Sequence, residues 1–403
     1  MTPEEIAAGM DGALQPYPDA TAQGHWAILP AETVQNHAAF LARLPDGALA
    51  CAWFGGTLEG KSDISIHASL LDEGSSVWGP AAQLSNDQTR SEQNPVIFVA
   101  PESRIWLFNT AQPAGNQDES RVYMRPLTRE GDRLTAGAPR DIGLPAGTFI
   151  RARPVLREDG AWVLPLFCCH PREGIRWTGA FDTAALAISR DEGASWVLED
   201  VPDSPGCVHM SPVDLGEGRM AAFYRRRQAD FVHRSESGDG GRSWSTPKPV
   251  DVPNNNSSLG VAQLSGGITA MVCNPVSAAQ SQARRASLYD ELEEQDDRPE
   301  AQEGCQPIWG VERAPMALCL SSDGGRSFPV QYILENSPGT CLSNNSLDGR
   351  NKELSYPVLL PRPDGGLDIA YTLYRRAIRH IRLSPETVAG LCARLDARIF
   401  ERI

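Results

Sequence analysis

Apolar residues in this chain fall in short runs, and a polar turn separates each run from the next. Six pairs of runs flank a turn made of Asp-Gly, Glu-Gly, Gly-Gly or Glu-Ser, and they lie within residues 41–53, 97–108, 155–167, 213–224, 262–272 and 358–371. Short runs bounded by Gly, Pro and Asp predict β-strands, and a tight turn between two of them predicts a hairpin. The pattern therefore predicts an all-β protein built from repeated hairpins.

A second repeat has the form Ser-x-Asp-x-Gly-x-x-aromatic. Good copies occupy residues 189–196, 237–244 and 321–328, and a degenerate copy runs from Ser69 to Trp78. In such an Asp-box, the Asp side chain caps backbone amides, Gly takes a positive φ, and the aromatic ring packs beneath the turn. Three good copies indicate a repeated all-β unit.

The hairpin turns allow the repeats to be counted. The first five recur at similar intervals, whereas the last interval is much longer and contains the charged segment 280–306, which we interpret as an insertion. Six turns predict a six-bladed β-propeller, an architecture that suits a chain of 403 residues. A seven-bladed propeller is the alternative if the insertion hides a degenerate blade.

Both ends of the chain carry helix signals. Thr2-Pro3-Glu4-Glu5 has a capping-box pattern, and Ser384-Pro385 opens a segment with apolar residues at helical spacing. We therefore expect a helical extension over 1–24, a propeller over 25–383 and a C-terminal helix over 384–403. The last helix has an apolar stripe made of Val388, Leu391, Leu395 and Ile399. We expect this stripe to pack either against the propeller rim or against a second subunit of a homo-oligomer.

Composition narrows the possible partners. A formal charge of −14 disfavours nucleic acid and anionic membranes, so an anionic substrate requires a local cluster of arginines. Nine cysteines without paired spacing favour reduced thiols, and the acidic start lacks a secretory pattern, so we expect a cytoplasmic protein. We expect no metal or other cofactor, because no zinc-type spacing or calcium loop is present.

Six blades with Asp-boxes resemble the sialidase superfamily, and the resemblance covers about residues 30–383. It implies a central active site with three carboxylate-binding arginines, a Tyr nucleophile with a Glu partner, and an acid/base Asp. Tyr356, within Glu353-Leu-Ser-Tyr356-Pro, resembles the nucleophile. Arg313 and one of Arg225 and Arg226 resemble two of the arginines, which suit paired recognition of a carboxylate.

Two positions depart from the family pattern. Gln35-Asn36-His37 occupies the place of the first arginine, and His209 occupies the place of the Glu that activates Tyr. Asn36 and Glu353 remain candidates for substrate binding, and His37 and His209 become candidate catalytic groups. These departures put ordinary hydrolysis of sialic acid in doubt.

Other candidates come from two regions. In the loop after the first hairpin, Asp63 resembles the acid/base residue, with Glu59 and Lys61 beside it, although Asp63 could instead cap a turn. A further group of arginines opens the inner strands of later blades and could replace the missing one, or could form inter-blade ion pairs: Arg90, Arg151 and Arg153.

A His/Tyr pair among arginines suits β-elimination from a uronic acid. The arginines would stabilise the developing enolate, one member of the pair would remove the C5 proton, and the other would protonate the leaving oxygen. Some β-propeller polysaccharide lyases use such sites. The sequence therefore predicts an enzyme that eliminates a terminal acidic sugar, with a sialidase-type hydrolase and a non-catalytic glycan-binding propeller as alternatives.

Overall fold

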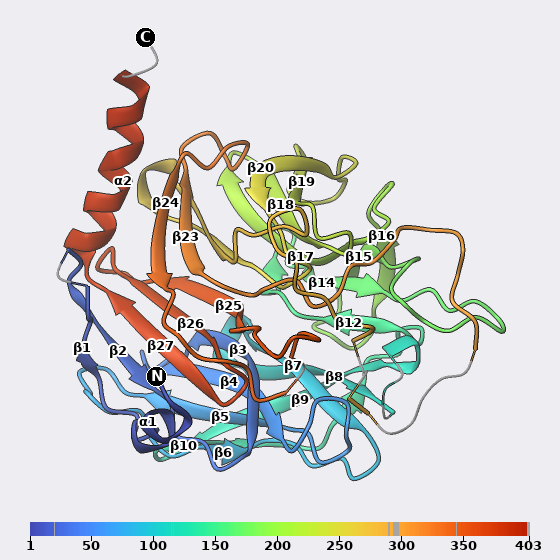
Figure 1. Ribbon diagram of the computed structural model, residues 1–403, viewed down its shortest axis with the longest axis horizontal. Coiled ribbons are helices and arrows are strands. Elements are labelled where there is room, and N and C mark those ends of the chain that lie inside the picture. The colour runs from blue at the N-terminus through green and yellow to red at the C-terminus, as the bar shows by residue number, and fades with distance from the viewer. Residues whose placement is uncertain are drawn as a thin grey trace.

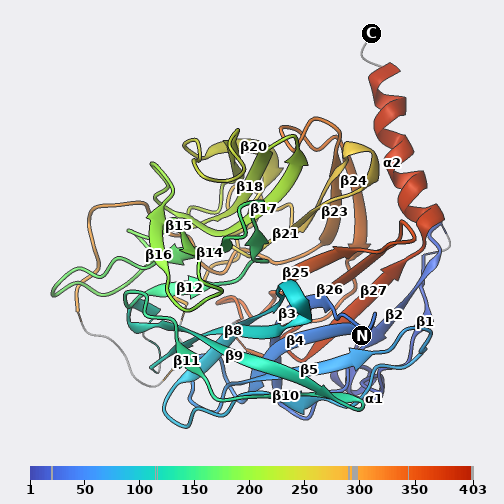
Figure 2. The same cartoon turned by 180° about the vertical axis from the view of Figure 1, so that it is seen from behind.

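Six β-sheets arranged as blades around a central axis form the body of the protein in a computed structural model. The structure describes residues 1–403 except positions 20, 114, 116, 289–290, 293–297, 344 and 401–403, and it describes no side chains for 396–400. Figure 1 shows the blades following one another around the axis in chain order, from β3 to β27, and Figure 2 shows the same ring from behind. The all-β, six-bladed propeller is confirmed. The residues described form no seventh sheet.

The strands of each blade run outward from the axis in sequence order. Blade 1 contains β3 (Gln35–Arg43), β4 (Leu49–Gly56), β5 (Ser65–Leu71) and β6 (Ala82–Gln83). Blade 2 contains β7 (Ser91–Val99), β8 (Ile105–Gln112), β9 (Arg121–Glu130), β10 (Arg133–Ala136) and β11 (Arg140–Asp141). Blade 3 contains β12 (Thr148–Ile150), β13 (Val155–Leu156), β14 (Trp162–Cys168), β15 (Thr183–Ser189) and β16 (Val197–Asp200).

The remaining blades follow the same plan. Blade 4 contains β17 (Cys207–Gly216), β18 (Arg219–Arg226), β19 (Phe231–Ser237) and β20 (Lys248–Pro253). Blade 5 contains β21 (Gly260–Gln263), β22 (Thr269–Cys273), β23 (Met316–Ser321) and β24 (Val330–Glu335). Blade 6 contains β25 (Leu354–Pro361), β26 (Leu367–Leu373) and β27 (Ala377–Leu383). Each predicted hairpin turn joins the innermost strand of a blade to the next strand.

Blade 6 is completed by the N-terminal segment. Strand β2 (Gly24–Ile28) pairs antiparallel with β27, and β1 (Gln15–Pro16) pairs with β2. The two ends of the chain therefore share one sheet, which closes the ring and leaves no unpaired blade edge at the closure. Because β1 lies within residues 1–24, the N-terminal extension is only partly helical.

Two helices flank the propeller. Helix α1 (Pro3–Ala8) begins with the predicted capping box between Thr2 and Glu5. Helix α2 (Pro385–Phe400) leaves the rim after β27 and projects away from the body, as Figures 1 and 2 show. Its buried residues Val388, Leu391 and Leu395 belong to the core of blades 5 and 6, so this part of the stripe packs against the propeller. Ile399 lies outside the described side chains.

The three good Asp-boxes connect the last two strands of their blades, namely β15 to β16, β19 to β20 and β23 to β24. In the first of them, Ser189 Oγ donates to Asp191 Oδ1 at 2.8 Å, and the backbone N–H of Ser195 donates to the same carboxylate at 2.9 Å. These hydrogen bonds, chiefly those from Ser195, lower the pKa of Asp191 to about 2.

The box aromatics also join neighbouring blades. Trp196 of blade 3 lies edge-on to Phe108 of blade 2, with ring centroids 6.0 Å apart. Phe328 of blade 5 meets Phe223 of blade 4 in the same way, at 5.9 Å. The turn that repeats in the sequence is therefore also a repeated contact between blades.

The insertion lies between β22 and β23 and contains no helix or named strand among its described residues. It reaches blade 3, where the Cys305 N–H donates to the Ala180 carbonyl at 2.9 Å. Just after the insertion, the Ile308 N–H donates to the Arg227 carbonyl of blade 4 at 2.8 Å. The insertion therefore lies over the face of the propeller at which the innermost strands start.

Two general expectations can be compared with the structure. All nine cysteines are free thiols. No described helix is both long enough and apolar enough to span a membrane.

Candidate active site

Irregular inner strands build the centre of the propeller. The pairing register shifts between His37 and Phe40 in β3, between Gln93 and Val96 in β7, between Val208 and Ser211 in β17, and between Ser355 and Val358 in β25. One residue in each shift has a positive φ: Ala38 (61°), Asn94 (51°), His209 (53°) and Tyr356 (51°). Such bulges re-aim side chains that a regular strand would place in the inter-blade core.

Tyr356 lies at the middle of the resulting cluster. Arg225 Nη1 donates to Tyr356 Oη at 2.7 Å. The His37 ring lies 4.3 Å from the Tyr356 ring and the His209 ring lies 5.6 Å from it, centroid to centroid. Arg151 Nη2 donates to the backbone carbonyl of Tyr356 at 3.0 Å. Residues from blades 1, 3, 4 and 6 therefore converge on one phenol.

Glu353 does not contact the phenol but bridges two arginines. Its Oε1 accepts from Arg313 Nη1 at 2.8 Å and from Arg375 Nε at 2.7 Å. Arg375 Nη1 also pairs with Glu59 Oε2. Burial would raise the pKa of Glu353, but the charges of Arg313 and Arg375 outweigh burial and lower it, so this carboxylate is ionised.

Two buried arginines of the cluster have no carboxylate partner among the described residues. Arg225 bonds only to Tyr356 and to Asn256 Oδ1, and Arg151 bonds only to backbone carbonyls. Burial lowers the pKa of Arg225 to about 9 and that of Arg151 to about 10, so both remain cationic at neutral pH. A buried charge without a counter-ion costs free energy, and a bound anion would offset that cost.

Both histidines of the cluster are neutral at physiological pH. Burial, followed by the charges of nearby arginines, lowers the pKa of His37 and of His209 well below the usual value. His37 Nδ1 lies 2.8 Å from Thr372 Oγ1. Within the described part of the chain, His37 Nε2 and His209 Nδ1 have no hydrogen-bond partner. His209 lines the pocket described below, where its free nitrogen can exchange a proton with a ligand, whereas His37 is fully buried beside it.

These shifts predict a pH-dependent stability. Burial is the first cause of a lowered pKa in five histidines, namely His37, His67, His209, His233 and His380. Below about pH 6.5 the unfolded chain binds protons that the folded protein does not, so the free energy of unfolding falls as the pH falls. Each such histidine adds up to about 1.4 kcal/mol per pH unit.

Urea unfolding at pH 7 and pH 5.5 measures this slope, and His37→Gln should reduce it. His25→Gln is the control because the His25 ring is exposed and solvated in both states. A slope that is equal in the wild type and in His37→Gln would contradict a neutral, buried His37.

A small pocket lies beside the cluster. Tyr356, His209, Arg225 and Arg227 line it, together with Glu59 from blade 1 and polar residues of blade 2. Leu288 of the insertion completes the lining. Arg227 is paired with Asp182, with Nη2 to Oδ2 at 2.6 Å. The candidate catalytic groups Tyr356 and His209 therefore face a common space.

Several predicted residues lie apart from this pocket. Asp63 is exposed, and its Oδ2 accepts from the Thr57 N–H at 2.9 Å, which is the turn-capping alternative. Lys61 is exposed in the same loop. Asn36 is buried, but its side chain is bonded to Trp53, Thr33 and the Arg376 carbonyl. These hydrogen bonds indicate that Asn36 has a structural role beside the site.

Three predicted arginines also point elsewhere. Arg226 bonds the Pro205 carbonyl at 2.6 Å. Arg90 bonds Tyr123 Oη at 2.9 Å on the rim of blade 2. Arg153 donates to the Leu41 carbonyl at 2.7 Å, two residues along the strand from the carbonyl that Arg151 binds. None of these contacts is with Tyr356, Glu353 or either histidine.

Sequence reasoning missed Arg375, which is fully buried between Glu353 and Glu59. A signal was present: Tyr224-Arg225-Arg226 ends the second strand of blade 4, and Tyr374-Arg375-Arg376 follows the second strand of blade 6. In both copies the first arginine turns toward the axis.

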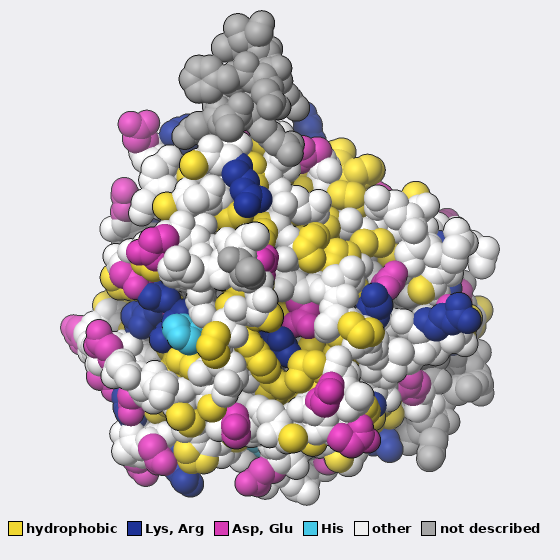
Figure 3. Space-filling model, turned by 60° about the vertical axis from the view of Figure 1, so that its left-hand side comes forward, with side chains coloured by type: hydrophobic (Ala, Val, Ile, Leu, Met, Phe, Trp, Pro, Cys, Tyr) yellow, Lys and Arg dark blue, Asp and Glu magenta, His cyan; other side chains and the backbone are white. Residues whose placement is uncertain are grey.

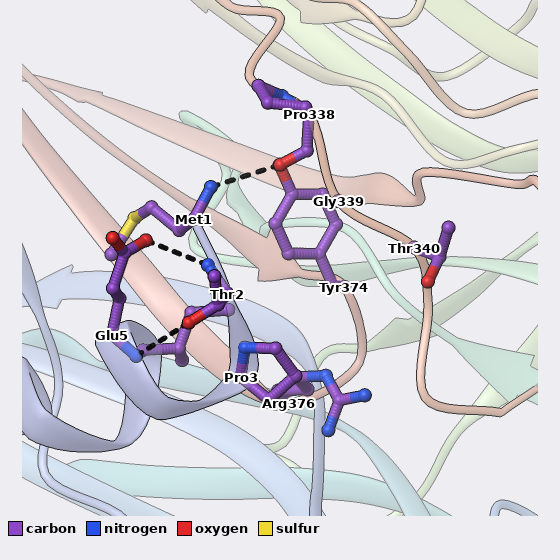
Figure 4. Close-up of a pocket in the computed structure, with 10 residues that line it drawn as sticks. Met1, Thr2, Pro3, Glu5, Pro338, Gly339, Thr340, Tyr374 and Arg376 are labelled. Carbon is purple, nitrogen blue, oxygen red and sulfur yellow. Dashed lines mark hydrogen bonds between the residues drawn. The ribbon is translucent and has the colours of Figure 1, made fainter.

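A second pocket lies outside the centre, between helix α1 and the turn that contains Tyr374. Figure 4 shows its lining, in which the amino group of Met1 donates to the Pro338 carbonyl at 3.0 Å and Glu5 accepts from the Thr2 N–H at 2.8 Å. None of the predicted site residues lines it. We therefore place the candidate site at the axis.

The face of the molecule in Figure 3 does not itself suggest an anion site. On the face in Figure 3, basic and acidic side chains are interspersed among apolar and neutral ones. The formal charge of the chain is −14. The cations without a described carboxylate partner, Arg151 and Arg225, lie inside the molecule beside Tyr356.

Comparison with known proteins agrees with this architecture. The profile of a family described as BNR repeat-like domain matches residues 47–369. No curated protein matches the sequence significantly.

Solved structures share the fold at low sequence identity. The Hadza microbial sialidase Hz136 has a TM-score of 0.64 at 12% identity, over 87% of this chain and 66% of that chain. The NanB sialidase from Streptococcus pneumoniae has a TM-score of 0.62 at 10% identity, over 96% and 73%. A protein of unknown function from Dyadobacter fermentans has a TM-score of 0.63 at 11% identity, over 91% and 100%. The chain thus spans about two thirds of the length of Hz136.

Proposed function

The chain belongs to the BNR repeat-like domain family, and from that premise we propose that it is an enzyme acting on a terminal acidic sugar of a glycan. The observation that carries the proposal is the pair of buried arginines without carboxylate partners, Arg151 and Arg225, around Tyr356. An anionic ligand is the natural counter-ion for such a site. The sialidase fold supports an action on sugars.

We favour β-elimination from a uronic acid because of what surrounds Tyr356. Glu353 is held by Arg313 and Arg375, whereas neutral imidazoles flank the phenol. A neutral imidazole accepts a proton near pH 7, and a phenol can donate one to a leaving oxygen.

In the proposed step the uronic acid is the reducing-terminal sugar and carries the departing sugar on O4, and His37 or His209 takes its C5 proton. The electron pair of that C–H bond forms the C4–C5 double bond as the C4–O bond breaks. Tyr356 then protonates the departing glycosidic oxygen. The arginines bind the carboxylate and stabilise the charge that develops beside C5. The step consumes no water, and its atoms and charges balance.

The alternative is sialidase-type hydrolysis with Tyr356 as the nucleophile. The 2.7 Å hydrogen bond from Arg225 favours it, because a guanidinium stabilises a phenolate. Asp63 would have to leave its contact with Thr57 to serve as the acid/base.

The products distinguish these chemistries. We expect oligosaccharides whose reducing-terminal uronic acid is glycosylated at O4 to give a conjugated product whose ultraviolet absorbance rises with time. Release of an intact sugar acid from sialyllactose or from a glucuronide, without that absorbance, would instead support hydrolysis. Binding without any product would support a glycan-binding propeller and would contradict both enzyme mechanisms.

A further inference from the structure

One arginine of blade 3 reaches across the propeller axis to two other blades. Arg151 lies between β12 and β13 of blade 3, and it is only 5% exposed. Its Nη2 donates to the Ala39 carbonyl of blade 1 and to the Tyr356 carbonyl of blade 6, in both cases at 3.0 Å. In a ring of six blades, blade 3 lies opposite blade 6. A single guanidinium therefore joins three blades at the centre of the molecule.

The two carbonyls belong to the bulges that present two of the candidate catalytic groups. Ala39 lies in the register shift of β3, two residues after His37, and Tyr356 lies in the register shift of β25. Neither Ala39 nor Tyr356 has a partner in the pairing register of its sheet. A buried carbonyl needs a hydrogen-bond donor, and here a side chain from another blade supplies it.

The backbone of Tyr356 needs support for a second reason. Its φ is 51°, a left-handed value that a residue with a large side chain adopts at a cost. Such a conformation persists only where the surrounding structure fixes it. The hydrogen bond from Arg151 fixes the carbonyl of this residue, and the guanidinium carbon lies 5.3 Å from the centre of the phenol ring. Without that bond, the backbone is free to return to a regular strand and to withdraw the phenol from the pocket.

The pocket distinguishes Arg151 from Arg225. Arg225 lines the pocket and donates to the Tyr356 hydroxyl, so it is placed to meet a sugar carboxylate. Arg151 is not among the described residues that line the pocket, and its Nη2 is occupied by the backbone. The charge of Arg151 still favours an anion nearby, but its hydrogen bonds serve the protein.

We propose that Arg151 is a positioning residue, which acts on the reaction by holding Tyr356 and the bulge beside His37 in place and does not itself bind the sugar. This inference rests on the proposed function, because it takes Tyr356 as a catalytic group. A positioning role separates turnover from affinity: loss of Arg151 lowers the first and leaves the second nearly unchanged.

The test compares three variants. Arg151→Met removes the donors, and Arg151→Lys keeps a cation and a donor of similar reach. Arg153→Met is the control from the same segment, because Arg153 donates to the carbonyl of Leu41, which is paired in the regular part of β3. Turnover of the oligosaccharide, affinity for D-glucuronate by tryptophan fluorescence and thermal unfolding are measured for each variant.

We expect Arg151→Met to lower turnover by about 10²-fold, the usual effect of displacing a reacting group by about 1 Å, and to bind D-glucuronate within a few-fold of the wild type. Arg151→Lys should recover part of the loss, and Arg153→Met should turn over as the wild type does. Wild-type turnover of Arg151→Met, or a loss of affinity in place of turnover, would overturn the inference and leave the proposed function intact. If Arg151→Met does not fold, Arg151→Lys carries the test: lower turnover at unchanged affinity supports the inference, and any other result overturns it.

A crystal structure of Arg151→Met tests the positioning without any activity. We expect Tyr356 to leave its φ of 51° in that variant, and an unchanged Tyr356 would contradict the inference. Absence of both turnover and acid binding in the wild type would instead overturn the proposed function.

Discussion

Replacing Arg375 with Met should lower the free energy of unfolding by about 3–5 kcal/mol, because it removes the guanidinium that two buried carboxylates share. Glu353 and Glu59 are 1% and 6% exposed, and Arg375 bonds both of them. Arg313 would remain beside Glu353, but Glu59 would lose its partner guanidinium. Urea unfolding at pH 7 measures the change.

Arg225→Met provides the matched comparison. Arg225 is also buried and also lies at the axis, but it has no carboxylate partner among the residues that the structure describes. Removing an uncompensated buried charge should leave the free energy of unfolding unchanged or raise it. If both variants lost the same stability, the distinction between paired and unpaired arginines would be wrong.

Replacing Tyr356 with Phe should lower turnover of the true substrate by about 10²–10⁴-fold, the usual contribution of a proton-transfer group. The ring contacts with His37 and His209 remain, so the variant should fold normally. Only the hydroxyl that bonds Arg225 is lost. The rate of product formation, read by absorbance or by release of the sugar acid, measures the effect.

Tyr123→Phe is a suitable control, since the Tyr123 hydroxyl also accepts from an arginine, Arg90, but on the rim of blade 2. It should retain wild-type turnover. Turnover of Tyr356→Phe within a few-fold of the wild type would exclude Tyr356 from the chemistry under either mechanism.

The fold could be predicted from the sequence because its signals are local and repeated. Each hairpin turn and each Asp-box is specified by a few neighbouring residues, so counting turns such as Asp159-Gly160 and Asp364-Gly365 counts the blades. The closure of blade 6 by β2 was not predicted, since it pairs segments from opposite ends of the chain.

Candidate residues at the centre were predicted from positions that resemble active-site positions of the sialidase superfamily. Tyr356, His37 and His209 were found in this way, and the structure brings them together. Arg375 and Asn94 were missed because their orientations depend on a turn with positive φ and on a bulge. The repeated Tyr-Arg-Arg triplet was a signal for Arg375, whereas the bulge at Asn94 has no short sequence signal.

The misplaced candidates have a related explanation. Asp63 was predicted from its resemblance to a family position and Arg90 from its place at the start of an inner strand, and neither signal says which way a loop side chain turns. Asp63 turns back to cap its own loop, and Arg90 turns outward to Tyr123. Local hydrogen-bond partners decided both orientations.

The most direct test of the central claim is a titration of the wild type and of Arg225→Met with D-glucuronate and with D-glucose. If the axial pocket holds a sugar carboxylate, the wild type should bind the acid and not the neutral sugar, and Arg225→Met should lose the acid while remaining folded. Equal binding of the two sugars by the wild type, or unchanged acid binding by Arg225→Met, would contradict the account.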